Sequence, residues 1–132
     1  MARLKRLEPV TLGGTAQWLF IHGDTRNPLL LWLHGGPGSA DIATAAFYGR
    51  ALTEHFLVVH GDQRGAGKSG VDDAPPLTID QLAEDAQELI VRLLHRFGQP
   101  DLYLVGHSWG SALGLVIARR VPGLIRAFTG VG

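Results

Sequence analysis

The sequence contains no cysteine, no excess of either charge and no long apolar run. Without cysteine, the 132 residues can form no disulfide bond, thiolate metal site or cysteine nucleophile. The 12 basic and 12 acidic residues cancel, which disfavours nucleic acids and membranes as partners. No stretch is long enough for a transmembrane helix, and residues 1–10 lack the apolar run of a signal peptide. We therefore expect one soluble, cytoplasmic domain without a metal or other cofactor.

Apolar runs mark the strands that we expect. Residues 28–36, 55–61 and 101–107 are continuous apolar runs, which are typical of strands covered on both faces of a sheet. A pair of glycines within residues 9–23 predicts a hairpin there, and a further strand is expected from residue 124.

Segments of helical period separate these strands. A capping box at Thr78 predicts the start of one helix, and Gly98 predicts its end. Residues 110–121 predict a second helix and residues 40–53 a short one. A hairpin followed by alternating strands and helices predicts an α/β fold with a mostly parallel sheet and flanking helices. Ligands of such sheets bind beyond the carboxyl ends of the strands, so the loops there should line one crevice.

Residues 61–70, GDQRGAGKSG, fit two nucleotide-binding patterns incompletely. A P-loop needs a glycine five residues before the glycine of Gly-Lys-Ser, and Asp62 occupies that position. The dinucleotide fingerprint needs a helix that opens directly on its glycines. Residues 71–78 instead carry two acids and two prolines, which predict a loop. We therefore expect no nucleotide site.

The loop after the last of the three apolar runs reads Gly106-His107-Ser108-Trp109-Gly110, a G-x-S-x-G pattern. At a junction between strand and helix, a sharp turn in this pattern lifts the serine hydroxyl above the sheet. Glycines are needed on both sides because a β-carbon would meet the neighbouring strand or helix. Ser108 could instead only cap the helix. Because strand, motif and helix are in register, we interpret Ser108 as a nucleophile.

The loop at residues 34–38, HGGPG, can supply a backbone N–H donor for an oxyanion hole. A tetrahedral intermediate needs at least two N–H donors aimed at its oxyanion. The backbone of Trp109 would supply one, and Gly36, with Gly35 as second choice, would supply the other. The alternative is a plain turn. We expect His34 to hold this loop through hydrogen bonds rather than to act as the base.

Three motifs together resemble the proline iminopeptidase (prolyl aminopeptidase) branch of the α/β-hydrolase superfamily. They are HGGPGS at 34–39, DQRGAGKS at 62–69 and GHSWGS at 106–111. The resemblance runs from about Pro9 to the end of the chain. It implies the N-terminal portion of an α/β-hydrolase fold and a serine hydrolase of peptide, amide or ester bonds. For the intact protein it implies a small peptide substrate with an N-terminal proline, and for this chain a peptide or ester substrate.

The same resemblance assigns a supporting role to the middle motif. It implies that Asp62 and Arg64 hold neighbouring loops together beside the site. Gly61 departs from the pattern, because the family more often has a bulky residue before the aspartate.

The residues after Ser108 include no aspartate, glutamate or histidine. The superfamily triad runs serine, then acid, then histidine along the chain. None of the earlier histidines has an obvious acid to orient it. We therefore expect residues 1–132 to be the N-terminal part of a single hydrolase domain, without its cap and C-terminal strands. Alone it should be nearly inactive, and should self-associate or pair with a C-terminal half. The alternative is a non-catalytic fragment, or one chain of a split enzyme, that keeps the fold and only binds or assembles.

Overall fold

The structure is a computed structural model that describes residues 3–33, 50–61, 78–107 and 109–131. The elements in chain order are β1 (Arg3–Leu12), β2 (Thr15–Asp24), β3 (Leu29–Leu33), the 3-10 helix η1 (Arg50–Glu54), β4 (Leu57–Gly61), α2 (Ile79–Phe97), β5 (Leu102–His107), α3 (Trp109–Arg120), the 3-10 helix η3 (Pro122–Leu124) and β6 (Ile125–Val131). Of the short helix expected at residues 40–53, residues 50–53 belong to η1, and residues 40–49 lie outside the described residues.

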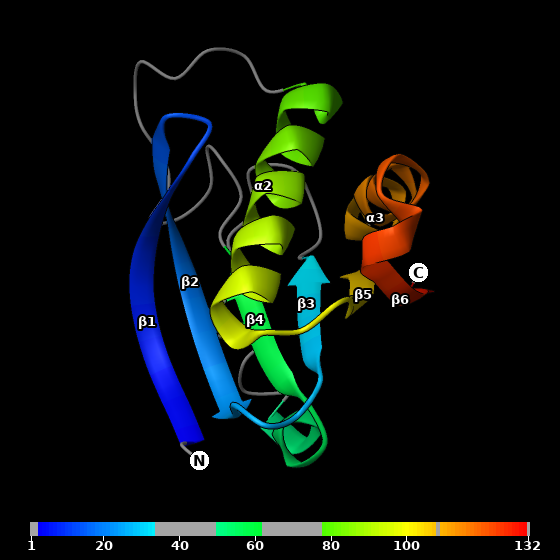
Figure 1. Cartoon of the computed structure of the whole chain (residues 1–132). Coiled ribbons are helices and arrows are strands. Elements are labelled where there is room, and N and C mark those ends of the chain that lie inside the picture. The colour runs from blue at the N-terminus through cyan, green and yellow to red at the C-terminus, as the bar shows by residue number, and fades with distance from the viewer. Residues whose placement is uncertain (1–2, 34–49, 62–77, 108, 132) are drawn as a thin grey trace.

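The described strands form one sheet in the order β1-β2-β4-β3-β5-β6. β1 pairs antiparallel with β2, and β2 pairs antiparallel with β4. β4, β3, β5 and β6 are parallel to one another, as Figure 1 shows for the central strands. The prediction of a hairpin followed by a mostly parallel sheet with helices is confirmed.

The N-terminal hairpin is longer than the sequence indicated. It begins at Arg3 rather than Pro9, and Arg3 pairs with Asp24 at its far end. The turn lies at Gly13 and Gly14, whose φ angles of 56° and 79° suit glycine. Residues 3–8 carry charges on both faces of the strand, so no apolar alternation reveals them. These residues form a strand because their backbone pairs with β2, and such pairing between distant residues cannot be read from a local sequence pattern.

α2 begins and ends where the sequence predicted. The hydroxyl of Thr78 accepts a hydrogen bond from the backbone N–H of Gln81 at 3.0 Å, which caps the first turn. Gly98 ends the helix with a φ of 65°, the left-handed conformation that favours glycine. The apolar side of α2 is buried against the sheet. The capping residues and the buried apolar side therefore both support a helix over Ile79–Phe97.

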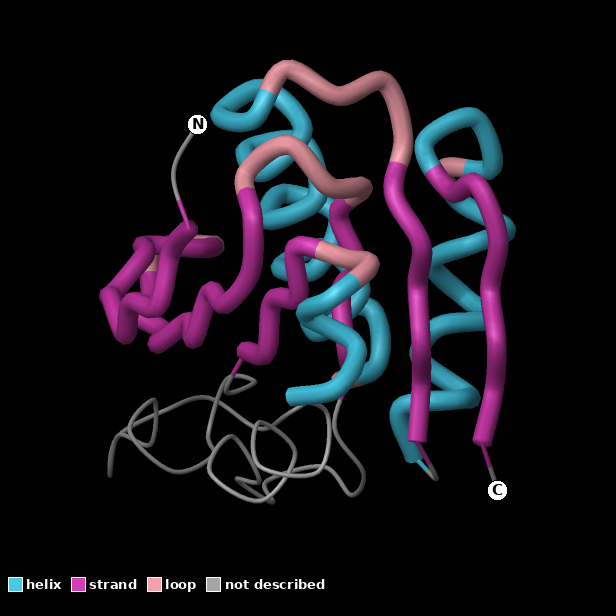
Figure 2. Tube along the Cα trace, turned by 90° about the horizontal axis from the view of Figure 1, so that it is seen from below, coloured by secondary structure: helices cyan, strands magenta, loops and turns pink. Residues whose placement is uncertain are grey.

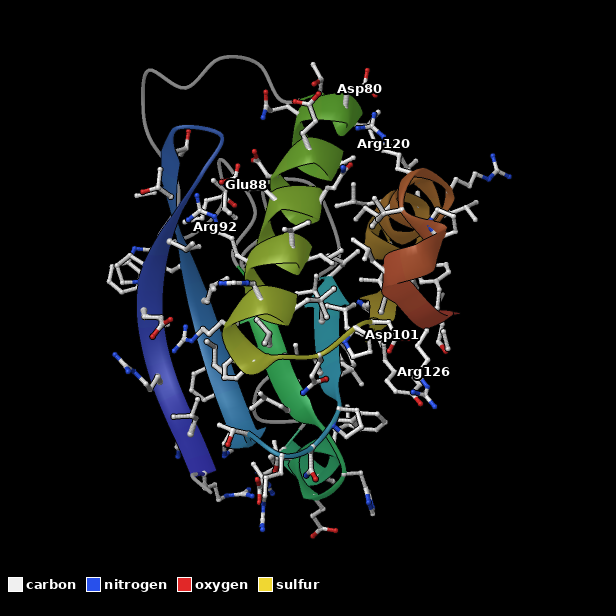
Figure 3. The ribbon with its side chains drawn as sticks, viewed as in Figure 1. Asp80, Glu88, Arg92, Asp101, Arg120 and Arg126 are labelled. Carbon is white, nitrogen blue, oxygen red and sulfur yellow. The ribbon has the colours of Figure 1, made fainter. Side chains whose placement is uncertain are left out.

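α2 and α3 pack side by side on one face of the sheet, where their inner residues share one apolar core. This core combines leucines of β2, β3 and β5 with Leu113 and Ile117 of α3. Arg120 at the end of α3 forms an ion pair at 2.7 Å with Asp80 in the first turn of α2 (Figure 3). In Figure 2, α3 runs alongside β5 and β6. No helix in the described ranges is long and apolar enough to cross a membrane.

Candidate active site

The carboxyl ends of β3, β4 and β5 lie at one edge of the sheet. These strands are parallel neighbours, and Leu33 at the end of β3 lies beside Gly106 of β5. β4 ends at Gly61 and β5 ends at His107. In open parallel sheets this edge is where ligands bind. The three strands therefore deliver the chain to one candidate site.

The passage from β5 to α3 is unusually short, because only Ser108 separates the two elements. A β-carbon placed on Gly106 would lie 2.3 Å from the carbonyl oxygen of Gly110 and 2.8 Å from the amide nitrogen of Ser111. No side chain fits at such distances. The end of the strand and the first turn of the helix are therefore in direct backbone contact, as a strained turn with glycines on both sides requires.

A side chain crosses the same contact. The hydroxyl of Ser111, in the first turn of α3, donates a hydrogen bond to the carbonyl oxygen of Gly106 at 3.0 Å. On its other side stands Gly130 of β6, where a β-carbon would lie 3.2 Å from the Ser111 hydroxyl oxygen. β5, α3 and β6 therefore meet around one small side chain, three residues after position 108 in the chain.

The start of α3 also supplies hydrogen-bond donors. Trp109 is the first residue of the helix. The first N–H groups of an α-helix have no acceptor within the helix, and they form the positive end of its dipole. A negative charge that develops beside this end would be stabilised by it.

A cavity of about 30 Å³ lies between α2 and the sheet, lined by apolar residues, by Gln17 and Asp85, and by the last residues of β3 and β4. The carboxamides of Gln17 and Gln81 each donate to the buried carboxylate of Asp85 at 2.9 Å. The space suits about one water molecule, and it is too small for a peptide. This polar cluster fastens the hairpin to α2, beneath the candidate site.

His60 lies one residue before the end of β4, with its ring near those of Phe20 and Trp32 at centroid distances of 6.3 Å and 5.9 Å. Burial lowers the pKa of His60 to about 4, and the nearby His22 adds to this effect. Among the described residues, its Nδ1 atom has no hydrogen-bond partner. A neutral imidazole with so low a pKa is a weak proton acceptor.

The other described histidines form no catalytic pair either. Within the described ranges, no hydrogen bond or ion pair joins a histidine to a carboxylate. In the same ranges, no cluster of three or more histidine, aspartate or glutamate side chains is arranged to hold a metal ion.

Residues 28–132 match the family model described as the alpha/beta hydrolase fold. The chain belongs to the α/β hydrolase family. The prediction of that fold, made from three short motifs, is confirmed.

Individual proteins resemble it over 71% to 96% of its length. It is 40% identical over 95% of its residues to a probable aminopeptidase, YbaC, of Bacillus subtilis, and it covers 40% of that protein. It is 40% identical over 71% of its residues to a proline iminopeptidase of Levilactobacillus brevis, covering 31% of it. A crystal structure of a proline iminopeptidase-related protein from Thermus thermophilus superposes with a TM-score of 0.79 at 29% identity, over 96% of this chain and 44% of that one. The chain therefore spans less than half the length of these relatives.

Most of the site residues predicted from the sequence lie outside the described residues of this hydrolase. They are His34, Gly35, Gly36, Asp62, Arg64 and Ser108. In the chain, they come directly or shortly after the ends of β3, β4 and β5, which lie at the same edge of the sheet. The described part also places the Trp109 backbone at the start of α3. Their individual roles stay predictions.

The sequence did not predict the contacts that Ser111 and Gly130 make where β5, α3 and β6 meet. Ser111 was visible as the last residue of GHSWGS, but that motif gave it no role. Its signal was the run of small residues at 110–111, which allows a helix to approach a strand closely. Gly130 gave no signal, because its contact with Ser111 joins residues of different elements.

Proposed function

We propose that this chain carries the nucleophile and the oxyanion hole of a serine hydrolase that cleaves peptide, amide or ester bonds. The observation that supports this is the β5–α3 junction, where Gly106 and Gly110 bring strand and helix into backbone contact around position 108. A helix cap alone does not require that contact, since capping serines occur at ordinary loop-to-helix starts. Membership of the α/β hydrolase family supports the same chemistry.

In this proposal the hydroxyl of Ser108 attacks the substrate carbonyl. The N–H of Trp109 and that of Gly36, with Gly35 as the second choice, bind the oxyanion of the tetrahedral intermediate. Each such donor lowers the barrier by about 3 kcal/mol, because it points at charge that appears only during the reaction. His34, Asp62 and Arg64 hold the surrounding loops in place.

The proposed substrates are peptides with an N-terminal proline. Two similar proteins are named probable aminopeptidase and proline iminopeptidase, and this supports an aminopeptidase over other hydrolases. Because the chain covers 40% and 31% of those proteins, this specificity belongs to the proposal for an intact enzyme.

The proposal also predicts that residues 1–132 alone turn over little substrate. No aspartate, glutamate or histidine follows Ser108, so neither acid nor base is available in the order of the superfamily. Without a base the serine hydroxyl stays protonated and attacks slowly. Only the residual catalysis of binding and oxyanion hole is left, roughly a thousand-fold above water.

Complementation tests this proposal. The chain, co-expressed with a C-terminal half that carries an aspartate and a histidine, should cleave proline naphthylamide. Ser108→Ala should abolish the cleavage, whereas Thr129→Val, an exposed hydroxyl-to-methyl change on β6, should leave it intact. Cleavage of a simple aryl ester alone would remove the aminopeptidase assignment and leave the hydrolase. A folded complex that cleaves neither compound would contradict the proposal and favour a chain that only binds or assembles.

A further inference from the structure

The N-terminal hairpin joins the parallel strands through one short ladder. β2 and β4 pair from Leu19 opposite Gly61 to His22 opposite Val58, which makes four residue pairs. Within the described sheet, the strand order β1-β2-β4 makes this ladder the sole strand pairing between the hairpin and the parallel strands (Figure 1). Residues 19–22 and 58–61 are called the β2–β4 junction below. This junction decides whether the hairpin and the parallel strands behave as one sheet.

Each strand of the β2–β4 junction carries a histidine on the face away from α2. His60 pairs directly with Phe20, and His22 lies two residues further along β2, on the same face. The ring centroid of Phe20 is 5.6 Å from that of His22 and 6.3 Å from that of His60. The intervening residues, Ile21 and Val59, point the other way into the apolar core. His60 is only 3% exposed and His22 is half-buried, so water solvates both imidazoles poorly.

The charged groups that act on these two histidines are cationic. Lys5 of β1 pairs directly with His22, and Arg3 lies on the same face of β1. Burial lowers the pKa of His22, and the charges of Arg3 and Lys5 lower it further. β3 contributes the ring of Trp32, which does not titrate, and η1 contributes Thr53, whose hydroxyl accepts a hydrogen bond from Arg3.

No carboxylate balances these cations at the β2–β4 junction. Asp24, two residues after His22 on β2, forms an ion pair with Arg26 at 2.8 Å. In the part of the chain that the structure describes, neither histidine has a hydrogen bond or ion pair to a carboxylate. The Nδ1 atom of His60 also has no acceptor among these residues to receive its proton. A protonated His60 would therefore be a buried cation without an anionic partner, which is unfavourable.

We propose that the β2–β4 junction is an acid-sensitive hinge, at which the hairpin separates from the parallel strands when His60 takes up a proton. Opening the junction lets water solvate the imidazolium. The turn end of the hairpin stays attached to α2, because the carboxamide of Gln17 donates to Asp85 at 2.9 Å on the other face of the sheet. The backbone N–H of Gly13 also donates to Glu88 of α2 at 3.0 Å. The inference does not depend on the proposed role of Ser108.

The hinge has a defined pH range. Burial, with a smaller contribution from the nearby His22, lowers the pKa of His60 to about 4, whereas an exposed histidine titrates near 6.5. Between these values the open junction binds more protons than the closed one, so opening becomes more favourable as the pH falls from 6.5 towards 4. For His60 alone, the open fraction should rise about twentyfold between pH 7 and pH 5.

Amide hydrogen exchange of the 132-residue chain, measured by NMR at pH 7 and pH 5, tests this inference. Each rate is corrected for the intrinsic pH dependence of exchange, so that the ratio reports the open fraction. The amides of the β2–β4 junction should exchange about twentyfold faster at pH 5 after this correction. The amides of the β3–β5 pair, at residues 30–33 and 103–106, and those of α2 should change clearly less. An equal rise in all three regions, or no rise at the junction, would overturn the inference.

Three variants assign the effect to its residues. His60→Phe should abolish the rise at the β2–β4 junction, because the ring stays large but no longer titrates. His95→Gln, which removes an exposed histidine from α2, is the matched control and should keep the full rise. His22→Gln removes the neighbouring charge and should give a smaller rise than wild type, whether or not His60→Phe folds. A full rise in His60→Phe or in His22→Gln would contradict the hinge.

Discussion

The two helices on the same face of the sheet are specified in different ways. α2 has its own signals at both ends, with Thr78 capping the first turn and Gly98 closing the last. α3 is separated from β5 by a single residue and contains Gly110 and Gly114. A glycine inside a helix costs about 1 kcal/mol relative to alanine, so the sequence of α3 weakens its own helix.

The contacts of those glycines explain the difference. Gly110 touches the backbone at Gly106, and a β-carbon on Gly114 would lie 2.4 Å from the ring of Phe128 in β6. The glycines of α3 therefore lower its helix propensity but allow it to pack closely against β5 and β6. α2 meets the sheet through ordinary apolar side chains and needs no such approach. The sequence of α3, beside the candidate site, therefore favours close packing on the sheet at the expense of helix propensity. The sequence of α2 favours a stable helix.

The largest effect is expected from a substitution that prevents the close approach of β5 and α3. Gly106→Ala would place a β-carbon 2.3 Å from the carbonyl oxygen of Gly110, and neither backbone can move freely. We expect the free energy of unfolding to fall by about 3 kcal/mol or more in urea denaturation. Gly123→Ala is the matched control, because open space surrounds Gly123 and the change there should be nearly neutral. Equal effects at both positions would remove the case for a special junction.

Acid should destabilise the fold through His60 of β4. The pKa of His60 is lowered to about 4 in the fold, against 6.5 when unfolded. Between these values the unfolded chain binds more protons, so stability is complete above pH 6.5 and falls as the pH drops towards 4. The loss between pH 7 and pH 5 should be about 2 kcal/mol for this group. His60→Phe should flatten this part of the pH profile in urea denaturation, and an unchanged slope would refute the assignment.

Gly114→Ala separates helix propensity from the approach to β6. Alanine improves the helix by about 1 kcal/mol, but its methyl group meets the ring of Phe128. We expect a net destabilisation of about 1 kcal/mol in wild type. In a Phe128→Leu background, the same change should be neutral or stabilising. A double-mutant cycle measures this coupling, and additive effects would show that the ring does not cause the cost.

Substitution of Thr78 and of Ser108 tests whether each hydroxyl caps the helix that follows it. Thr78→Ala removes the hydrogen bond to the N–H of Gln81 and should cost about 1 kcal/mol. Ser108→Ala should cost clearly less, because we assign Ser108 to chemistry rather than capping. Thermal unfolding of the two variants gives both values. A larger loss for Ser108→Ala would favour the capping interpretation.

The smallest effect concerns the ion pair that joins the two helices. Arg120 bonds to Asp80 at 2.7 Å, but the side chain of Asp80 is 77% exposed. Exposed ion pairs are screened by water and salt, so Arg120→Ala should cost less than about 0.5 kcal/mol. A loss above 1 kcal/mol in urea denaturation would mean that this pair, and not the apolar core, couples α2 to α3.

The sequence predicted those parts of the fold that depend on local signals. The caps of α2, the apolar runs of the parallel strands and the glycine turn of the hairpin each act over a few residues, and all three are confirmed. The first residues of β1 were missed because charged side chains occupy both of its faces. The contact of Ser111 with Gly130 was missed because it forms only when β6 pairs with β5.

The most direct measurement locates the reactive serine. The chain has four serines, at positions 39, 69, 108 and 111. After the chain, paired with a C-terminal half that carries an aspartate and a histidine, is incubated with a fluorophosphonate, peptide mass spectrometry should find the adduct on Ser108 only among these four serines. Ser108→Ala should carry none. An adduct on another of these serines, or none on Ser108 in the folded complex, would contradict the assignment of the β5–α3 junction as the place of the nucleophile.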